Sequence, residues 1–485
     1  MMLLPFALVA QNEQKLDSII LIQDTIKQKV MTINDKVAAV EERLTTAEND
    51  LAKATKLKIS GYIQGQWVNY EASNVYPNNL FQVRRARIKF TYEPINGVIF
   101  VLQPDFQPGN ITIKDAYAQV NDPWLNMFSL YLGKFNRPNY EIEYSSSSRE
   151  VPERSRVIRS IYPDERAIGA KLEIHPSKIP LKFQLALFNG NDGLSVPDAS
   201  GNYSIIQNND YDNHKDVMAR LTYTFKLAKF ATLTVGAHGY YGGIKATSTT
   251  NLNSDYTINK TTEITQILPK QWYGVEGQLY MDLWGGLILK GEYIRGVNTI
   301  PGLTTSASSF NSTQSIKNDT LFINNITTKT STSTPSITKS FAGWYVYAVK
   351  NIGRRNQVAV RYDWYNPNTD LNNTDFSKDK YDGSKTTNGT PSIAYAGNTA
   401  LSTQTNNVYT SKLAAGTSDI AYGTWTFAYS YFFTDNIKFM VGYEIPMNKN
   451  SNVTQSYTVN GITSTYNYNN RINQNTLTLR LQVKF

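Results

Sequence analysis

The chain has 485 residues, a formal net charge of +9 and a mean hydropathy of −0.39. No apolar run approaches the roughly 18 residues that a membrane-spanning helix needs, which excludes a helical membrane protein. Cysteine is absent, which excludes disulfide scaffolds and thiolate sites. A polar chain with 32 tyrosines is typical of membrane proteins in which apolar and polar residues alternate instead of forming runs.

The chain opens with a short apolar run, residues 1–10 (MMLLPFALVA), which is too short to span a bilayer. It predicts a partial secretory signal peptide that is cleaved after Ala10. No basic segment precedes it, and Leu8 is a poor residue at the third position before the cleavage point. A wrongly assigned start codon would explain the missing basic segment.

A heptad repeat follows, in a region without Gly or Pro. Position a holds Leu16, Gln23, Val30, Val37, Leu44 and Leu51, and position d holds Ile19, Ile26, Ile33, Val40, Ala47 and Ala54. This pattern predicts a coiled coil over residues 11–56, and the choice of residues favours trimers or tetramers over dimers. The oligomer contacts are expected from Ile19, Ile26, Val30, Ile33, Val37 and Val40. An amphipathic helix folded back on the rest of the chain is the alternative.

After Lys56 the period changes to two, most clearly at the end, where Leu477, Leu479, Leu481, Val483 and Phe485 alternate with polar residues. The alternation predicts sixteen strands, each about long enough to cross a membrane when tilted. The predicted strands are 58–70, 80–92, 97–106, 111–121, 127–135, 166–175, 181–190, 216–225, 230–242, 271–282, 286–297, 340–350, 356–366, 421–433, 437–446 and 475–485. We therefore expect an all-β transmembrane barrel of about 16 antiparallel strands over residues 57–485.

The connections between these segments alternate in length. Long connections lie near 136–165, 191–215, 243–270, 298–339, 367–420 and 447–474. In outer-membrane barrels short turns are periplasmic and long loops are extracellular, and an even strand number returns both chain termini to the periplasm. We therefore expect a bacterial outer-membrane location among lipids, with the coiled coil in the periplasm. A barrel of sixteen strands is wide enough to enclose an aqueous channel.

The residues opposite the apolar face of each strand are expected to line this channel. In the second strand Arg85, Arg87 and Lys89 alternate with apolar residues and are predicted to point inward. The same alternation places further charged residues inside: Lys171, Glu173, Arg220, Lys290, Glu292, Arg361, Asp363 and Arg480. Basic residues exceed acidic ones, which favours anions, and arginine suits phosphate and carboxylate. A wall whose charges only shape a transverse field is the alternative.

The connection 136–165 carries more charge than the later long loops. It contains Arg137, Glu141, Glu143, Arg149, Glu150, Glu153, Arg154, Arg156 and Arg159. We expect it to fold into the channel as a constriction, with basic side chains from Arg149, Arg154, Arg156 and Arg159. A solvated surface loop is the alternative.

Five segments resemble one known family. They are KISGYIQGQW (58–67), FQVRRARIKF (81–90), IKDAYAQV (113–120), LYLGKFNRP (130–138) and LALFNGND (185–192). In this order they resemble the phosphate-selective porin O and P family, in a form typical of Bacteroidota. The resemblance implies a sixteen-stranded trimeric barrel with an inward third loop and an arginine-lined path. It also implies that Arg84, Arg85 and Arg87 are pore arginines.

The leading hypothesis is thus a passive homotrimeric channel for small hydrophilic solutes, anionic or neutral, with anion preference and with phosphate as a candidate solute. It needs no cofactor. An envelope tether that uses the barrel as an anchor and the coiled coil for periplasmic or cell-wall partners is the alternative. An enzyme is disfavoured because His175, His214 and His238 have no evident Ser or Asp partner and no metal-ligand spacing. Nucleic-acid binding is disfavoured because the excess charge is spread over many strands.

Overall fold

A computed structural model describes most of the chain. The described residues are 21–32, 36–37, 40–44, 56–71, 77–162, 164–190, 195–197, 203–205, 213–248, 251–252, 258–260, 264–282, 285–300, 304–306, 331–333, 336–369, 408–409, 420–451, 454–459 and 462–485. The chain divides into two units, an amino-terminal segment and a large β unit.

The amino-terminal unit is helical where it is described, at residues 21–32, 36–37 and 40–44. The expected seam residues Ile26, Val30, Val37 and Val40 are exposed on this single chain. The pairing of helices into a coiled coil stays a prediction. The apolar run 1–10 and the heptad positions Leu16, Ile19, Ile33, Ala47, Leu51 and Ala54 lie outside the described residues. Among the helices that the structure describes, none has the length and apolar character needed to span a membrane.

The β unit is built on sixteen long antiparallel strands. They are β1 (Leu57–Tyr70), β2 (Asn79–Ile95), β3 (Val98–Gln107), β4 (Asn110–Asn121), β5 (Phe128–Asn136), β6 (Arg166–Ile174), β7 (Leu181–Phe188), β10 (Asp216–Ala228), β11 (Ala231–Ser248), β14 (Ile264–Met281), β15 (Leu287–Ile300), β18 (Ser336–Ile352), β19 (Asn356–Asn366), β21 (Tyr422–Thr434), β22 (Ile437–Asn448) and β25 (Thr476–Lys484). Each pairs with the next along this series, so that the strands form a meander.

Short strands occupy the long connections. Four pairs form separate two-stranded sheets, and β20 (Val408–Tyr409) lies parallel to the start of β18. The pairs are β8 (Ser195–Pro197) with β9 (Tyr203–Ile205), β12 (Asn251–Leu252) with β13 (Ile258–Lys260), β16 (Thr304–Ser306) with β17 (Ser331–Ser333), and β23 (Thr454–Val459) with β24 (Ile462–Asn467). Two short helices, α2 (Tyr140–Glu143) and α3 (Arg156–Ile161), lie between β5 and β6.

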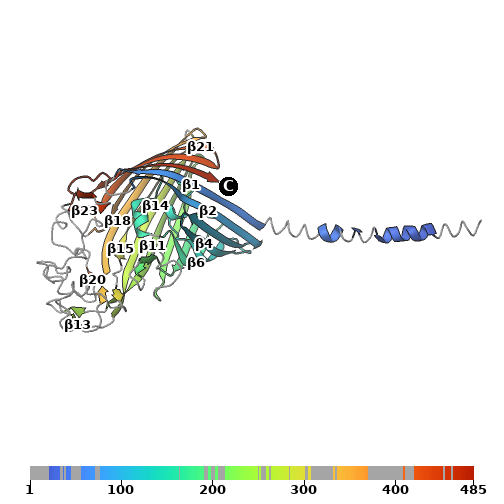
Figure 1. The fold of residues 1–485 in the computed structure, drawn as a ribbon, viewed down its shortest axis with the longest axis horizontal. Helices are drawn as coiled ribbons and strands as arrows, with labels where there is room; N and C mark the ends of the chain where they lie inside the picture. Colours follow the sequence, from blue (N-terminus) through green and yellow to red (C-terminus); the bar gives the residue numbers. More distant parts are fainter. Residues whose placement is uncertain are drawn as a thin grey trace, which may run out of the picture. The chain divides into compact units, whose positions relative to one another are not determined.

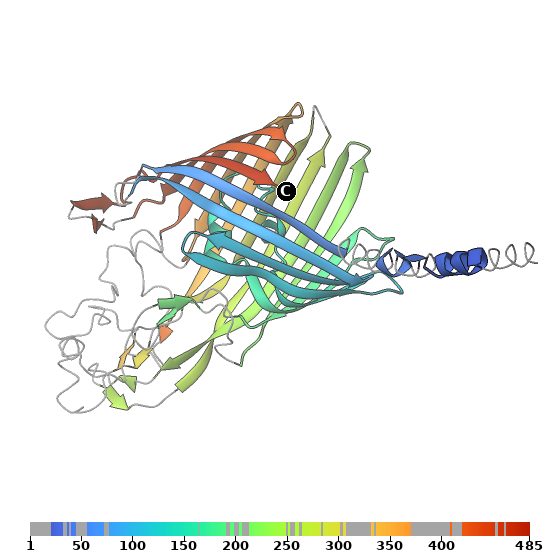
Figure 2. The same cartoon turned by 45° about the vertical axis from the view of Figure 1, so that its right-hand side comes forward.

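The barrel closes where its first and last strands pair. Nine residue pairs join β1 to β25, from Tyr62↔Lys484 to Tyr70↔Thr476, and the two strands lie side by side in both ribbon views (Figures 1 and 2). Beyond this ladder, the backbone groups of Gly61 and Phe485 exchange two hydrogen bonds of 3.0 Å. Because no strand keeps an open edge, the backbone groups of the wall are paired within the protein, as hydrocarbon surroundings require.

All sixteen predicted strands are confirmed, most with ends within three residues. The clearest differences are at β11, β14 and β18, which run several residues further than expected. In the β11–β14 hairpin the pairing continues through Gly243 opposite Pro269 to Ser248 opposite Ile264. Glycine and proline interrupt the alternation of apolar and polar residues there, which is why the sequence pattern ends too early.

The two faces of the wall differ in chemistry. Along β21, Trp425, Phe427 and Tyr429 are exposed, while the intervening Thr424 and Thr426 are buried. The same pattern recurs on the other strands, for example in the exposed pairs Leu130 and Leu132, Leu185 and Leu187, and Leu481 and Val483. An outer surface of regularly spaced apolar side chains and an inner one of polar side chains is the arrangement of a membrane barrel.

Candidate functional site

The connection between β5 and β6, residues 137–165, forms the main feature inside the barrel, and we call it the inserted loop. It begins with helix α2, whose amino terminus is capped by Asn139: the side-chain oxygen accepts hydrogen bonds from the backbone N–H groups of Glu141 (3.1 Å) and Ile142 (3.4 Å). Asparagine is among the preferred residues at this position because it satisfies backbone donors that the first turn leaves unpaired. Helix α3 follows after a charged segment.

One side of the inserted loop is apolar and belongs to a buried cluster that includes wall residues from β5 to β21. The loop contributes Ile142, Val157, Ile158, Ile161 and Tyr162 to a buried cluster. The wall contributes chiefly aromatic side chains, including Tyr240, Trp272, Phe341 and Tyr345. The Trp272 indole donates to the Tyr162 hydroxyl at 2.9 Å and stacks on Tyr240 with ring centres 4.1 Å apart. This half of the lumen is therefore filled by a packed core.

The other side of the inserted loop is polar and is bonded to strands around the barrel. Glu153 binds Arg84 of β2 and Arg480 of β25, Glu150 binds Lys290 of β15, and Glu143 binds Arg220 of β10. The remaining partners come from β1, β7, β14, β18, β19 and β22. The structure thus shows the expected inward folding of the connection 136–165.

Basic side chains gather around Glu153, and we call Arg84, Arg85, Arg149, Arg480 and Lys438 the basic cluster. Arg84 donates to both Glu153 oxygens, at 3.0 and 2.9 Å, and Arg480 donates to one at 3.0 Å. Arg149 lies 3.8 Å from the same carboxylate. Lys438 donates to the backbone oxygen of Arg149 at 2.8 Å. Three of these five cations, Arg84, Arg149 and Arg480, thus share the carboxylate of Glu153.

The arrangement leaves donors of the basic cluster unused. Among the residues that the structure describes, the buried Nε atoms of Arg85 and Arg149 have no hydrogen-bond acceptor. Burial lowers the pKa of the Arg149 guanidinium, and the positive charge of Arg84 lowers it further. The negative charges of Glu153 and Glu141 raise this pKa but do not offset the lowering. For Glu153, burial opposes ionisation, but Arg84, Arg85 and Arg480 outweigh it and hold the pKa of this carboxyl well below its usual value. The cluster is therefore short of negative charge.

Three other predicted pore residues have carboxylate partners of their own. Arg87 pairs with Asp105 at 2.8 Å, Arg220 with Glu276 and Glu143, and Arg361 with Asp363 and Glu444. Buried cations need such partners because an unpaired charge in the interior is costly. These arginines point inward as expected, but their charges are already balanced. Lys89 is half-buried on the same strand as Arg87.

Arg84 and Arg85 both enter the lumen although they are consecutive. Phe81 and Val83 are exposed, whereas Arg85 and Arg87 are buried, so the odd-numbered residues of β2 change sides between 83 and 85. Arg84 reaches Glu153, and Arg85 donates to Gln64 of β1 at 3.0 Å. A local break of this kind, as in a β-bulge, re-aims side chains. Strict alternation places only Arg85 inside.

The four arginines expected at the constriction take different positions. Arg149 belongs to the basic cluster. Arg154 is buried, donates to the backbone oxygens of the α2 region and pairs with Glu165. The Arg156 guanidinium lies 4.1 Å from the centre of the Tyr422 ring, and Arg159 is exposed on α3. The inserted loop therefore uses Arg154 to hold its own fold.

Solvent reaches the charged residues of the lumen unevenly. The side chains of Arg84 on β2 and Lys182 on β7 are 31% and 37% exposed, whereas those of Arg361 and Glu292 are fully buried. Glu143 and Glu165 of the inserted loop are also partly exposed. The lumen thus contains both water-accessible and fully buried charged side chains.

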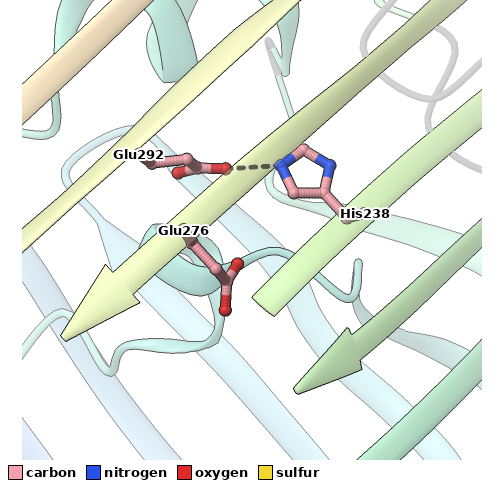
Figure 3. Close-up of side chains that lie close together, drawn as sticks. All are labelled: His238, Glu276 and Glu292. Atoms are coloured by element: carbon pink, nitrogen blue, oxygen red, sulfur yellow. Dashed lines mark hydrogen bonds and ion pairs between the residues drawn. The ribbon is translucent and has the colours of Figure 1, made fainter. Parts of the chain in front are cut away.

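Sequence reasoning did not recognise two groupings of inward residues, although the alternation predicts that Glu292 points inward. The first is the set of carboxylates that balance the arginines, such as Asp105 and Asp115. The second is a buried group of His238, Glu276 and Glu292, which come from three consecutive wall strands (Figure 3). Glu276 falls on an inward-facing position of β14 by the alternation of that strand. That it lies directly opposite Glu292 is known only from the register between β14 and β15.

Residues 51–267 match the model of the family described as phosphate-selective porin O and P. A search of curated protein sequences finds no match. Among solved structures, the chain is similar to OprB of Pseudomonas putida (TM-score 0.49, 9% identity, 91% of this chain and 96% of that chain). It is also similar to an anion-selective porin from Comamonas acidovorans (TM-score 0.43, 8% identity, 88% and 99%). A third is the trimer form of OmpT from Vibrio cholerae (TM-score 0.46, 9% identity, 88% and 99%).

The family match and the closed barrel point to a channel rather than an enzyme. The matched range contains all five of the sequence segments quoted above, and it confirms that the chain resembles the phosphate-selective porin O and P family over residues 51–267.

Proposed function

We propose that this chain forms a passive, water-filled channel in the bacterial outer membrane for small hydrophilic solutes, with a preference for anions. The observation that carries the preference is the basic cluster, in which Arg84, Arg149 and Arg480 share the carboxylate of Glu153 and Arg84 is partly exposed to water. Basic residues that line a pore favour anions because they replace part of the hydration that the anion loses.

The geometry supports permeation rather than tight binding. Arg84 is partly exposed and bonded to Glu153, so an anion that passes it competes with a carboxylate already in place. Arg85 and Arg149 offer unused Nε donors behind it. An anion is thus attracted but remains able to leave, which is what conduction requires. Phosphate is a candidate solute because the guanidinium fork matches its oxygens.

The test is the Arg85→Gln variant, measured as the reversal potential across a planar bilayer under a chloride salt gradient. Removing a charge about 5 Å from the ion path through water changes the ion's energy by roughly 0.8 kcal/mol before screening. We expect the anion-to-cation permeability ratio to fall about two- to fourfold. Arg354→Gln, at an exposed position in the β18–β19 turn, removes the same charge far from the cluster and is the control. An equal fall in both variants would contradict the assignment.

The proposal includes a homotrimer with periplasmic termini and extracellular long loops. The exposed apolar side chains on the outer face provide surface for lipid and for neighbouring copies. Mass measurement of the detergent-solubilised protein, with the detergent contribution subtracted, tests the trimer. Protease accessibility of the 367–420 connection on intact cells tests the orientation.

A second candidate function is an envelope tether, favoured by the exposed seam residues Ile26, Val30, Val37 and Val40. Deletion of residues 12–55 separates the roles. If conductance survives and the trimer persists while the envelope becomes fragile, the segment is a tether. If only the trimer dissociates, the segment serves oligomerisation.

A further inference from the structure

We propose that His238, Glu276 and Glu292 form a binding site for a divalent transition-metal cation inside the barrel wall. His238 lies on β11, Glu276 on β14 and Glu292 on β15, and one ligand atom from each lies within 4.8 Å of the others. In Figure 3 the side chains of His238 and Glu292 point toward each other, and the side chain of Glu276 lies beside them. This site goes beyond the proposed channel function and does not depend on it.

The ligand types and spacing suit such an ion. Imidazole nitrogen and carboxylate oxygen bind Zn²⁺ at about 2.0–2.2 Å, so that ligands arranged as a tetrahedron lie roughly 3.4 Å apart. Here Nε2 of His238 and Oε1 of Glu292 are 2.6 Å apart, and the third ligand atom lies within the 4.8 Å limit. Small side-chain rotations therefore suffice to enclose an ion. One nitrogen among the ligands favours Zn²⁺ and similar ions over Mg²⁺ and Ca²⁺, which prefer oxygen.

The backbone around the site leaves room for the ligands. Gly274 lies directly opposite His238 in the β11–β14 ladder, and a Cβ atom at this glycine would come within 2.4 Å of Nε2 of His238. Gly236 lies opposite Glu276, and a Cβ atom there would come within 2.9 Å of the carboxylate. Two glycines thus keep open the space on either side of the ligand atoms.

The charged residues around the three proposed ligands favour the binding of a cation. Glu276 and Glu292 are cross-strand neighbours, and both are buried. Like charges in this position repel each other. Arg220 pairs with both Glu276 and Glu143, so two carboxylates share this guanidinium, while Glu292 contacts His238. Lys182 also faces Glu143, at 3.7 Å, but it is more exposed and is shared with Glu173.

Glu292 is additionally held by neutral donors. The Tyr345 hydroxyl donates to Oε2 at 2.5 Å, and the Asn139 side-chain amide donates to Oε1 at 2.8 Å. Such outer contacts orient a metal-binding carboxylate. Because Asn139 also caps helix α2, the site is connected to the start of the inserted loop.

The composition of the chain allows the contribution of His238 to metal binding to be measured separately from other imidazole or thiolate ligands. It contains three histidines and no cysteine. The double variant His175→Gln/His214→Gln therefore leaves His238 as the sole imidazole, provided that the purification tag lacks histidine. Titration of the detergent-solubilised, folded protein with Zn²⁺ alone is followed by calorimetry, and Co²⁺ is used as a spectroscopic substitute. We expect one ion per chain in the wild type and in the double variant.

The His238→Gln and Glu292→Gln variants are expected to weaken Zn²⁺ binding at least tenfold and to abolish the Co²⁺ visible bands. Heat-modifiable migration on gels shows that each variant is still a folded barrel. If one of them does not fold, Glu276→Gln gives the same test at the third ligand. A tenfold excess of Mg²⁺ is expected not to compete.

Three results would overturn the proposal. They are the absence of Zn²⁺ binding by the wild type, binding that the His238→Gln variant retains, and equal competition by Mg²⁺. The first would mean that His238 and Glu292 form an ion pair only.

Discussion

At the scale of single residues, Glu153 is the point at which the inserted loop meets the basic cluster. Its carboxylate binds Arg84 and Arg480 and lies near Arg149. The Glu153→Gln variant removes the negative charge that these three arginines share. We expect its anion-to-cation permeability ratio at pH 7 to exceed that of the wild type, measured as a reversal potential.

The pH dependence of this difference follows from the lowered pKa of Glu153. A carboxyl whose pKa is lowered in the folded state stays ionised, and keeps its stabilising contribution, until the pH falls through that lowered pKa. The difference between wild type and Glu153→Gln should therefore persist from pH 7 to pH 4.5, the usual pKa of a glutamate. Comparing the two proteins isolates Glu153 from the other carboxyls. A difference that is half lost at pH 4.5 would show that the neighbouring arginines do not hold the pKa down.

Residue positions in the lumen could be predicted where alternation holds. Parity alone predicts that Arg220, Arg361 and Arg480 point inward, and all three are buried in the structure. Their carboxylate partners could not be predicted, because Glu276 and Glu444 come from other strands and Glu153 comes from the inserted loop. This matters for function, since it divides the basic residues into balanced ones and those of the basic cluster.

At the scale of elements, the inserted loop is held by an apolar core as well as by ion pairs. Ile158 lies at its centre and is almost fully buried. Truncation of such a side chain to alanine costs about 2–5 kcal/mol, and a buried aspartate costs more because its charge has no partner. We expect Ile158→Asp to release α3 from the wall and to raise single-channel conductance.

The barrel itself should survive this change, because its strand ladders do not involve Ile158. Heat-modifiable migration on gels is expected to be unchanged. Ser160→Asp places the same charge at an exposed position of the same helix and is the control. Unchanged conductance in Ile158→Asp, with the barrel intact, would mean that the loop does not limit the current.

The strands were predictable and the short helices were not. A strand that separates lipid from a polar lumen must alternate apolar and polar side chains. This alternation is visible in the sequence, as in β21 and β25. Helices α2 and α3 have four and six residues, too few to show a helical period. The charge density of the connection indicated an inward loop, but its apolar contacts come from aromatic residues of distant strands.

At the scale of the whole molecule, closure depends on β25, which pairs with both β22 and β1. Deleting residues 476–485 leaves two open edges in a wall that faces hydrocarbon, where unpaired backbone groups are costly. We expect this variant to lose heat-modifiable migration and all channel activity.

A deletion of similar size elsewhere provides the control. Residues 454–467 form the separate β23–β24 hairpin, and the backbone N–H of Ser451 donates to the Tyr468 oxygen at 2.9 Å, so that the ends of the excised segment are already joined. This variant should remain a folded, conducting barrel. If it fails as completely as the first, the loss in both reflects general sensitivity to deletion rather than closure.

The pairing of β1 with β25 also constrains the order of events in folding. Gln66 and Arg480, which bond across it at 2.8 Å, are separated by 414 positions along the chain. Joining two points so far apart costs about 5 kcal/mol in chain entropy, and topologies dominated by distant contacts form slowly. The barrel cannot close before β25 has left the ribosome. Until then the nascent chain has strand edges with unpaired backbone groups, which can pair with other chains. The chain therefore avoids aggregation in water only if hydrophobic collapse is delayed until β25 is available.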